Sequence, residues 1–330
     1  MIQHPAIIAL LSSAVIINLL LLYASIYGVK ILAHWDITSG SELQLQLERR
    51  TYLISTILGY SLVFQLLSLF LLIFTADSLH SLFTGAMCAA GSLGANRFGY
   101  PLLALKTGNA LLAGVWLLIN RLDSLGYDYP LIRSKYRMLL ALALLVSIET
   151  VLQFRYFLGL KADLITSCCG SLFSSAGRGI GSELAGLPPK TMMILLAGAF
   201  ILMAAAFLTG IIRNRGWLPF AAAGQLFFIT SVAALISFIS LYFYELPTHH
   251  CPFCILQREY WHIGYLLYAC LLGGAISAGG AGAAELFRNR DSLKIVIPGF
   301  QRKAAIISML LYSLFLAISL LRIFSTSFVL

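Results

Sequence analysis

Residues 192–212 read MMILLAGAFILMAAAFLTGII, an apolar run that contains no charged side chain. Wound as an α-helix at about 1.5 Å per residue, a run of this length extends roughly 30 Å, which matches the hydrocarbon core of a lipid bilayer. The run therefore predicts a transmembrane helix.

Seven other runs of similar length and composition flank this one in the chain. With it, the predicted spans are residues 6–32, 52–74, 101–119, 136–158, 192–212, 217–246, 254–281 and 304–323. The runs are continuous and rich in Leu, Ala and Ile, whereas strands of a membrane barrel alternate over about 10 residues. We predict an all-α, polytopic integral membrane helical bundle of about eight transmembrane helices.

The composition agrees with this class. Hydrophobic residues make up 60% of the 330 residues, charged residues only 11%, and the mean hydropathy is +0.90. Soluble domains carry roughly 25% charged residues. The first run has no basic segment before it and is longer than a cleaved signal, so we expect it to be retained as a span. We expect one transmembrane domain, with possible halves 1–160 and 190–330 joined by the loop 161–190.

The formal charge of +9 raises the possibility of nucleic-acid binding, which the distribution of the charges argues against. Fourteen of the twenty-two Lys and Arg residues fall in alternate loops on one predicted face: Lys30, Arg49, Arg50, Arg121, Arg133, Lys135, Arg137, Arg213, Arg215, Arg288, Arg290, Lys294, Arg302 and Lys303. By the positive-inside rule this face is cytoplasmic, and both termini lie outside the cytoplasm. We therefore expect a multi-pass protein of the cytoplasmic (inner) membrane without a nucleic-acid partner.

The chemistry concentrates in residues 248–259, which read THHCPFCILQRE between the sixth and seventh runs. Pro252 suits the first turn of a helix, so we expect the seventh span to begin within this segment. Cys251 would then lie at a helix N-terminus, where the helix dipole favours a thiolate. Arg258 would follow Cys254 by one helical turn on the same face, close enough to stabilise a thiolate or to donate to a quinone carbonyl.

Five of the six cysteines are predicted to lie on the same, extracytoplasmic face. They are Cys88, Cys168, Cys169, Cys251 and Cys254, in three separate loops. Cys270 falls inside a span and is interpreted as a small packing residue. Cysteines in an oxidising compartment tend to be paired or redox-active, so the three loops predict a shared thiol centre.

The pattern Cys251-Pro252-x-Cys254-Ile255-x-Gln257-Arg258 resembles the signature of the DsbB family of quinone-reducing, disulfide-forming membrane proteins. It is more distantly similar to the vitamin K epoxide reductase family. The resemblance covers residues 249–265 and implies that Cys251 and Cys254 form a redox pair beside a quinone, with Arg258 in contact with it. His262 is a second candidate for that contact.

The remainder of the chain departs from these families. Eight spans are predicted where DsbB proteins have four, and no outer cysteine pair follows the motif. Shuttle cysteines must therefore come from before it, from Cys168 and Cys169 or from Cys88. We expect a thiol–disulfide oxidoreductase that exchanges electrons between quinone and a periplasmic thiol protein, such as a thioredoxin-like partner, in either direction.

Two other interpretations use the same residues. His249, His250, Cys251 and Cys254 form a ligand set suited to a soft metal ion, copper or zinc, as in a metal-handling membrane protein. Further candidate ligands are Cys88, Cys168, Cys169 and His80 or His262. The chain also fits a membrane subunit of a respiratory complex. Attachment of c-type haem is disfavoured, because Ile255 stands where the Cys-x-x-Cys-His pattern needs histidine.

One ionisable residue stands well inside a predicted span. Glu149 lies in the fourth run, with Arg155 about one and a half turns later. Ionisable groups in a bilayer are costly, so both a proton path and a buried ion pair are consistent with this position.

Overall fold

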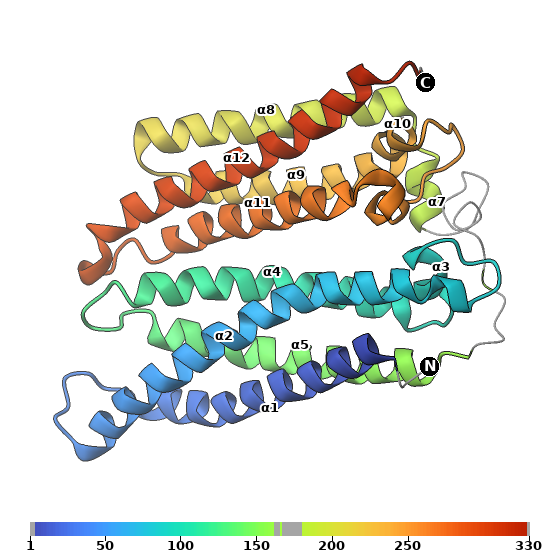
Figure 1. The fold of residues 1–330 in the computed structure, drawn as a ribbon. Coiled ribbons are helices and arrows are strands. Elements are labelled where there is room, and N and C mark those ends of the chain that lie inside the picture. Colours follow the sequence, from blue (N-terminus) through green and yellow to red (C-terminus); the bar gives the residue numbers. More distant parts are fainter. Residues whose placement is uncertain (1–3, 162–165, 167–179, 329–330) are drawn as a thin grey trace. The chain divides into compact units, whose positions relative to one another are not determined.

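The computed structural model describes residues 4–161, 166 and 180–328, and every regular element among them is helical (Figure 1). Within these residues, eight helical segments are long and apolar enough to cross a membrane. The protein is thus an all-α, multi-pass membrane helical bundle, which confirms the predicted fold class. The spans are α1 (Pro5–His34), α2 (Glu42–Ser78), α4 (Gly99–Asp123), α5 (Ile132–Leu158), α8 (Pro189–Arg213), α9 (Trp217–Ala234) continued by η2 (Leu235–Ile239) and α10 (Ser240–Tyr244), α11 (Ile263–Glu285) and α12 (Val296–Ser325).

Short helical turns connect or flank these spans. They are η1 (His80–Leu82), α3 (Ala89–Gly94), α7 (Ile180–Ala185), η3 (Cys254–Leu256), η4 (Arg258–Tyr260) and η5 (Asp291–Leu293). The chain divides into two compact units, both discontinuous in sequence. Unit 1 contains Met1–Leu72, Arg97–Leu160 and Ala283–Phe300, and unit 2 contains Ile73–Asn96, Lys161–Gly282 and Gln301–Leu330.

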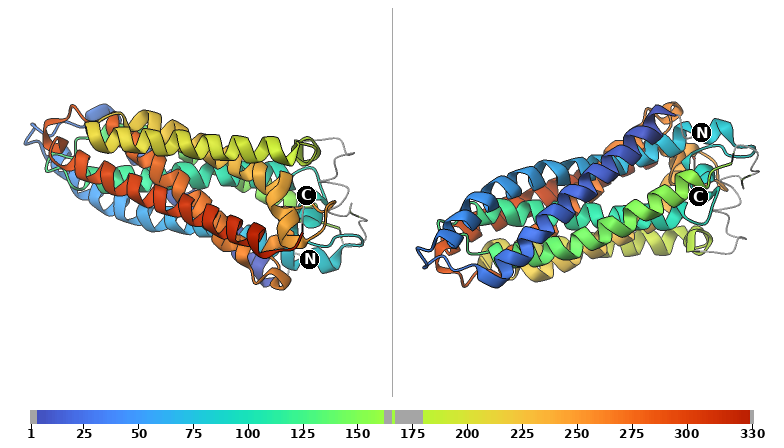
Figure 2. Two further views of the ribbon diagram at one scale, coloured as in Figure 1. Left: turned by 90° about the horizontal axis from the view of Figure 1, so that it is seen from above. Right: turned by 90° about the horizontal axis from the view of Figure 1, so that it is seen from below.

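In unit 1, α5 packs along both α1 and α4 (Figures 1 and 2). Its core is built from apolar side chains of α1, α2, α4 and α5, with Trp116 and Tyr136 among the largest side chains that are fully buried. The opposite faces of these helices stay apolar as well: Ile16 is 57% and Val151 59% exposed. A helix that is apolar on its outer face as well as its inner one suits a lipid surround.

Two buried ion pairs join α4 to α5 in unit 1. Lys106 of α4 contacts Glu149 of α5 at 2.6 Å, and Asp123 of α4 contacts Lys135 of α5 at 2.7 Å. Each helix contributes one cation and one anion, and all four side chains are at most 3% exposed. Each cation therefore meets an anion only when the two helices are antiparallel and in this register.

The Glu149 carboxylate is hydrogen-bonded on both oxygens. Lys106 Nζ donates to Oε1, while Gln65 Nε2 at 2.6 Å and Asn109 Nδ2 at 2.7 Å donate to Oε2. Lys106 Nζ also reaches Gln153 Oε1 at 3.1 Å. Of the two readings open for Glu149 from the sequence, the buried ion pair is present, and its partner is Lys106 of another helix rather than Arg155.

In unit 2, α8 packs along α9, and small residues bring α11 and α12 close to α9 (Figure 2). Tyr312 of α12 donates its hydroxyl to the Gly224 carbonyl at 2.9 Å. A Cβ on Gly274 would come within 2.7–2.8 Å of three ring carbons of Tyr312. Glycine is required at this position because only a hydrogen lets the aromatic ring lie against the helix backbone.

The sixth span changes its helical type shortly before it ends. Between α9 and α10, the π-helical turn η2 covers Leu235–Ile239. Such turns, which use i→i+5 bonds, interrupt the regular backbone pattern and occur often at functional sites. Here the carbonyl of Ile236 receives a contact from the ring of His250 at 3.0 Å, which ties the segment after α10 to this turn.

The seventh span begins later than predicted. We expected a helix from residue 254, but α11 starts at Ile263, and two 3₁₀ turns, η3 and η4, lie between the cysteine pair and the helix. Trp261 and His262 then adopt left-handed backbone angles, with φ of 56° and 53°, which α-helical geometry does not allow. The prediction that Cys251 lies at an α-helix N-terminus was therefore wrong, and so was the placement of Arg258 one α-helical turn beyond Cys254.

Candidate thiol site

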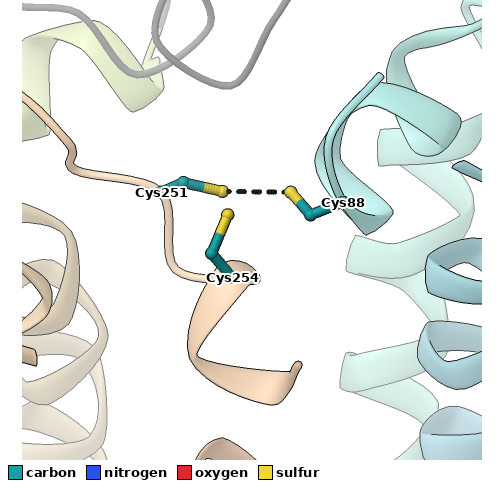
Figure 3. A group of neighbouring side chains, drawn as sticks. All are labelled: Cys88, Cys251 and Cys254. Carbon is teal, nitrogen blue, oxygen red and sulfur yellow. Dashed lines mark hydrogen bonds between the residues drawn. The ribbon is translucent and has the colours of Figure 1, made fainter. Parts of the chain in front are cut away.

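Three cysteines converge in unit 2 (Figure 3). The Sγ atoms of Cys88, Cys251 and Cys254 all lie within 4.8 Å of one another. The contact between Cys88 Sγ and Cys251 Sγ, at 3.5 Å, joins residues 163 positions apart in the sequence. A disulfide bond is about 2.05 Å long, so this separation is a contact between two sulfur atoms rather than a bond.

Cys88 is positioned by a tight turn and by the short helix that follows it. Gly85 has φ +90°, and a Cβ there would meet the Thr166 carbonyl oxygen at 2.6 Å, so the turn requires glycine. The Thr166 amide donates to the Thr84 carbonyl at 2.9 Å. The backbone of Cys88 is extended, and α3 begins with Ala89, whose amide donates to Asp77 Oδ1 at 3.1 Å.

Cys251 and Cys254 are positioned by backbone contacts from two tyrosines. Tyr244, the last residue of α10, donates its hydroxyl to the Cys251 carbonyl at 2.5 Å, and Tyr268 of α11 donates to the Pro252 carbonyl at 2.7 Å. Cys254 opens η3, so the Cys-x-x-Cys segment is a bend that leads into a 3₁₀ turn. The two tyrosines thus tie this bend to the helices before and after it.

Gln257 connects the two cysteine segments. Its Nε2 donates to the Met87 carbonyl at 2.8 Å and lies 3.4 Å from Asp77 Oδ1. Met87 directly precedes Cys88, and Gln257 comes three residues after Cys254. One amide side chain therefore fixes the distance between the segment that carries Cys88 and the segment that carries the Cys-x-x-Cys pair.

The two neighbouring histidines have different contacts. His249 Nε2 lies 3.2 Å from Cys254 Sγ, and the His249 ring packs edge-on against Tyr244. His250 instead directs its Nδ1 to the Ile236 carbonyl. His249 is thus placed to form a hydrogen bond with a thiol or to exchange a proton with it. His250 instead contacts a backbone carbonyl of the π-helical turn.

Arg258 and His262, the residues predicted to bind a quinone, lie on the exposed side of the segment that leads into α11. The ring Nδ1 of His262 lies 2.7 Å from the Leu256 carbonyl. Within the part of the chain that the structure describes, the Arg258 side chain forms no ion pair. Trp261 between them is 91% exposed.

The three cysteine residues are buried. Cys88 and Cys251 are 0% and Cys254 is 5% exposed. Next to them, burial raises the pKa of Tyr260, and the charge of a Cys254 thiolate acts in the same direction, so the phenol stays neutral near pH 7. The site holds thiols, one imidazole and neutral phenols, a chemistry that suits sulfur exchange or soft-metal binding.

Of the other predicted site residues, Cys168 and Cys169 lie outside the described residues. Cys270 is buried in α11 and is not part of the group of three, as expected for a packing residue. Three residues that position the site were not identified from the sequence: Asp77, Tyr244 and Tyr268. Gln257 belongs to the motif, but its bond to Met87 depends on a loop 170 residues away that spacing does not reveal.

Comparisons with protein-family models, with curated proteins and with solved structures find no match for this chain.

Proposed function

We propose that the protein is a thiol–disulfide oxidoreductase of the cytoplasmic membrane, which exchanges electrons between extracytoplasmic thiols and a quinone through Cys251 and Cys254. The observation that carries the proposal is the approach of Cys88 to this pair, with three sulfur atoms inside 4.8 Å. A single packing cysteine needs no such neighbours, whereas disulfide exchange requires sulfur atoms within reach of one another.

In the oxidised state a disulfide joins Cys251 and Cys254, and a substrate thiolate attacks one of these sulfurs, which breaks that bond and forms a mixed disulfide. The second substrate thiolate resolves the mixed disulfide, so the substrate leaves as a disulfide and both cysteines are left as thiols. Two electrons and two protons then pass to the quinone, giving a quinol and restoring the Cys251–Cys254 bond. Reversal of each step gives the quinol-dependent reductase.

Cys88 adds one more disulfide-exchange step. Because its Sγ lies 3.5 Å from Cys251 Sγ, a disulfide between Cys88 and Cys251 forms by exchange with Cys254 as the leaving thiolate. By this route a thiolate of Cys168 or Cys169 attacks Cys88 of the Cys88–Cys251 disulfide and releases the Cys251 thiolate. The other of these two cysteines then attacks the mixed disulfide, so that a Cys168–Cys169 disulfide forms and Cys88 leaves as a thiol. His249, in contact with Cys254 Sγ, takes up and returns the proton of that thiol.

The proposal assigns the quinone to the exposed segment between η3 and α11. Arg258 and His262 supply a cation and an imidazole there, and Trp261 supplies an exposed aromatic face. A guanidinium can donate to a quinone carbonyl and so favour the negative charge that develops on reduction. This placement agrees with the orientation inferred from the Lys and Arg distribution, which puts the segment outside the cytoplasm.

The test is quinol formation by the purified, reconstituted chain supplied with a quinone and a reduced thioredoxin-like protein. We expect turnover in the wild type and in Cys270→Ser, and turnover at background in Cys251→Ser and in Cys254→Ser. If either of these two variants turns over at the wild-type rate, the assignment of the pair is wrong. If no dithiol protein and no quinone supports turnover in either direction, the proposed function is wrong.

A separate arm of this assay tests the quinone site. Arg258→Met is expected to raise the KM for quinone about tenfold, since loss of a hydrogen bond to a charged group costs about 1.5 kcal/mol. The KM for the dithiol protein is expected to stay unchanged. An unchanged KM for quinone would remove Arg258 from the site.

A further inference from the structure

We infer that the reduced cluster of Cys88, Cys251 and Cys254 is a binding site for one thiophilic metal ion, Cu(I) or Zn²⁺. The inference goes beyond the proposed oxidoreductase, although it uses the same sulfur atoms. It also narrows the set of candidate ligands from the sequence, because Cys88 joins the Cys-x-x-Cys pair whereas the ring of His250 contacts the Ile236 carbonyl.

The distances between the sulfur atoms fit a shared ion. A metal–thiolate bond is about 2.3 Å long, so three sulfurs around one ion in a trigonal plane are separated by roughly 4.0 Å. The Cys88–Cys251 separation is 3.5 Å, and every pair in the group lies within 4.8 Å. The Cys88–Cys251 pair would have to widen by about 0.5 Å, and no pair would have to shorten by more than about 0.8 Å, to hold an ion between the three sulfurs.

The composition of the site selects the class of metal. The group of three contains sulfur alone and, among the described residues, no carboxylate shares it. Thiolate ligands prefer Cu(I) and zinc over magnesium, calcium or manganese, which prefer oxygen. The three cysteine residues are also at most 5% exposed, as in closed metal sites that leave no position for water.

His249 provides the observation that separates the two metals. Its Nε2 lies 3.2 Å from Cys254 Sγ, but His249 is not a member of the group of three. Zinc sites are almost always four-coordinate, and Cys₃His is one of their common ligand sets. A zinc ion would therefore recruit His249, whereas a Cu(I) ion can be held by the three sulfurs alone.

The neighbouring residues already hold the ligands in place. Tyr244 and Tyr268 fix the carbonyls of Cys251 and Pro252, and Gln257 fixes the segment that precedes Cys88. Contacts of this kind, one shell beyond the ligands, typically change metal affinity by about 10–100-fold when they are removed.

Binding is an exchange of protons for metal without change of oxidation state. Each cysteine that ligates loses its S–H proton, so up to three protons leave when one ion enters. A sulfur that is bonded to another sulfur no longer offers the thiolate. The site can therefore hold the ion only in its reduced state, and the oxidant of the proposed function would expel it.

The experiment is a titration of the reduced, full-length protein in detergent, without oxygen, against Cu(I) and separately against Zn²⁺, each in competition with a chelator. We expect one ion per chain for the wild type and for Cys270→Ser, which removes a buried cysteine outside the cluster. Cys88→Ser is expected to lose at least about tenfold in affinity. Substoichiometric binding by the wild type, or full affinity in Cys88→Ser, would overturn the inference.

Two further readouts keep the test independent of folding and of the oxidoreductase. X-ray absorption of the loaded wild type is expected to show three sulfur neighbours, and two or fewer contradict the site. If the ion is held as inferred, His249→Gln weakens Zn²⁺ binding and leaves Cu(I) binding unchanged. An equal loss of affinity for both ions, with the ion bound by fewer than three sulfurs, counts against the inferred site. Since quinol formation is measured without metal, either proposal can fail while the other stands.

Discussion

At the residue scale, the site depends on a few contacts that bring distant segments together. Cys88 precedes a short helix, Cys251 lies in a bend, and neither position follows from the local pattern alone. What joins them is the Gln257 side chain, through its bond to the Met87 carbonyl. The thiol centre is therefore a property of tertiary contacts made by a residue with no redox chemistry of its own.

Gln257 gives the first prediction. Gln257→Leu keeps the volume but removes the donor to Met87, so the Cys88 segment should separate from the Cys-x-x-Cys bend. We expect slower formation of the Cys88–Cys251 disulfide under a mild oxidant, with the Cys251–Cys254 disulfide unaffected, both measured by mass spectrometry. Gln46→Leu, at an exposed glutamine of α2, is the matched control. An unchanged rate in Gln257→Leu would show that the amide does not position Cys88.

The Lys106–Glu149 pair gives the second prediction. Glu149→Leu or Lys106→Leu alone leaves a charge buried without its partner, which costs about 3–5 kcal/mol of unfolding free energy. Replacing both residues by leucine should cost less than either single change, because no isolated charge remains. The measurement is unfolding in mild detergent, with Lys303→Leu at an exposed lysine as control. Additive losses would contradict a direct pair.

The partner of Glu149 could not be predicted from the sequence. Glu149 was recognisable because it interrupts an apolar run, but Lys106 stands near the start of a predicted span and nothing in the sequence pairs it with Glu149. Its burial at 1% exposure depends on α4 packing against α5. Partners on different helices are set by packing, and hydropathy along one chain carries no information about which faces meet.

At the scale of elements, the eight spans were predictable because each must satisfy its backbone within the segment and present apolar side chains to lipid. The start of α11 was not. Pro252 was consistent with a first helical turn, yet the chain forms two 3₁₀ turns and a left-handed pair at Trp261 and His262 before the helix begins. Tertiary hydrogen bonds from Tyr244 and Tyr268 hold this irregular segment, and they override the local preference.

Helix packing in unit 2 gives the third prediction. Gly274→Ala puts a methyl group against the ring of Tyr312, which can move only by giving up its bond to the Gly224 carbonyl. We expect a loss of about 1–3 kcal/mol in unfolding free energy, as for other overpacked contacts. Gly198→Ala on α8, where the added methyl group meets nothing within 4 Å, serves as the control. Equal stability of the two variants would show that Tyr312 does not need this glycine.

At the scale of the whole molecule, the orientation of the chain follows from charge rather than from packing. The eight spans are present, but the side of the membrane on which each loop lies is inferred from Lys and Arg alone. This inference matters because an oxidising compartment keeps cysteines available for disulfide exchange, whereas the cytoplasm keeps them reduced.

Reporter fusions give the fourth prediction. Alkaline phosphatase, which is active only outside the cytoplasm, should be active when fused after residue 247 and inactive when fused after residue 215 or residue 290. A reporter that fluoresces only in the cytoplasm should give the opposite pattern. The reverse result at all three positions would place the thiol site in the cytoplasm and remove the basis for disulfide formation there.

The central claim is that Cys88, Cys251 and Cys254 form one redox centre, and disulfide trapping tests it most directly. In a variant that keeps only these three cysteines, with Cys168, Cys169 and Cys270 replaced by serine, membranes are treated with diamide and the peptides are mapped without reduction. We predict two products, a Cys251–Cys254 disulfide and a Cys88–Cys251 disulfide. If Cys88 remains fully alkylatable while the other two pair, or if all three remain thiols, the account is wrong.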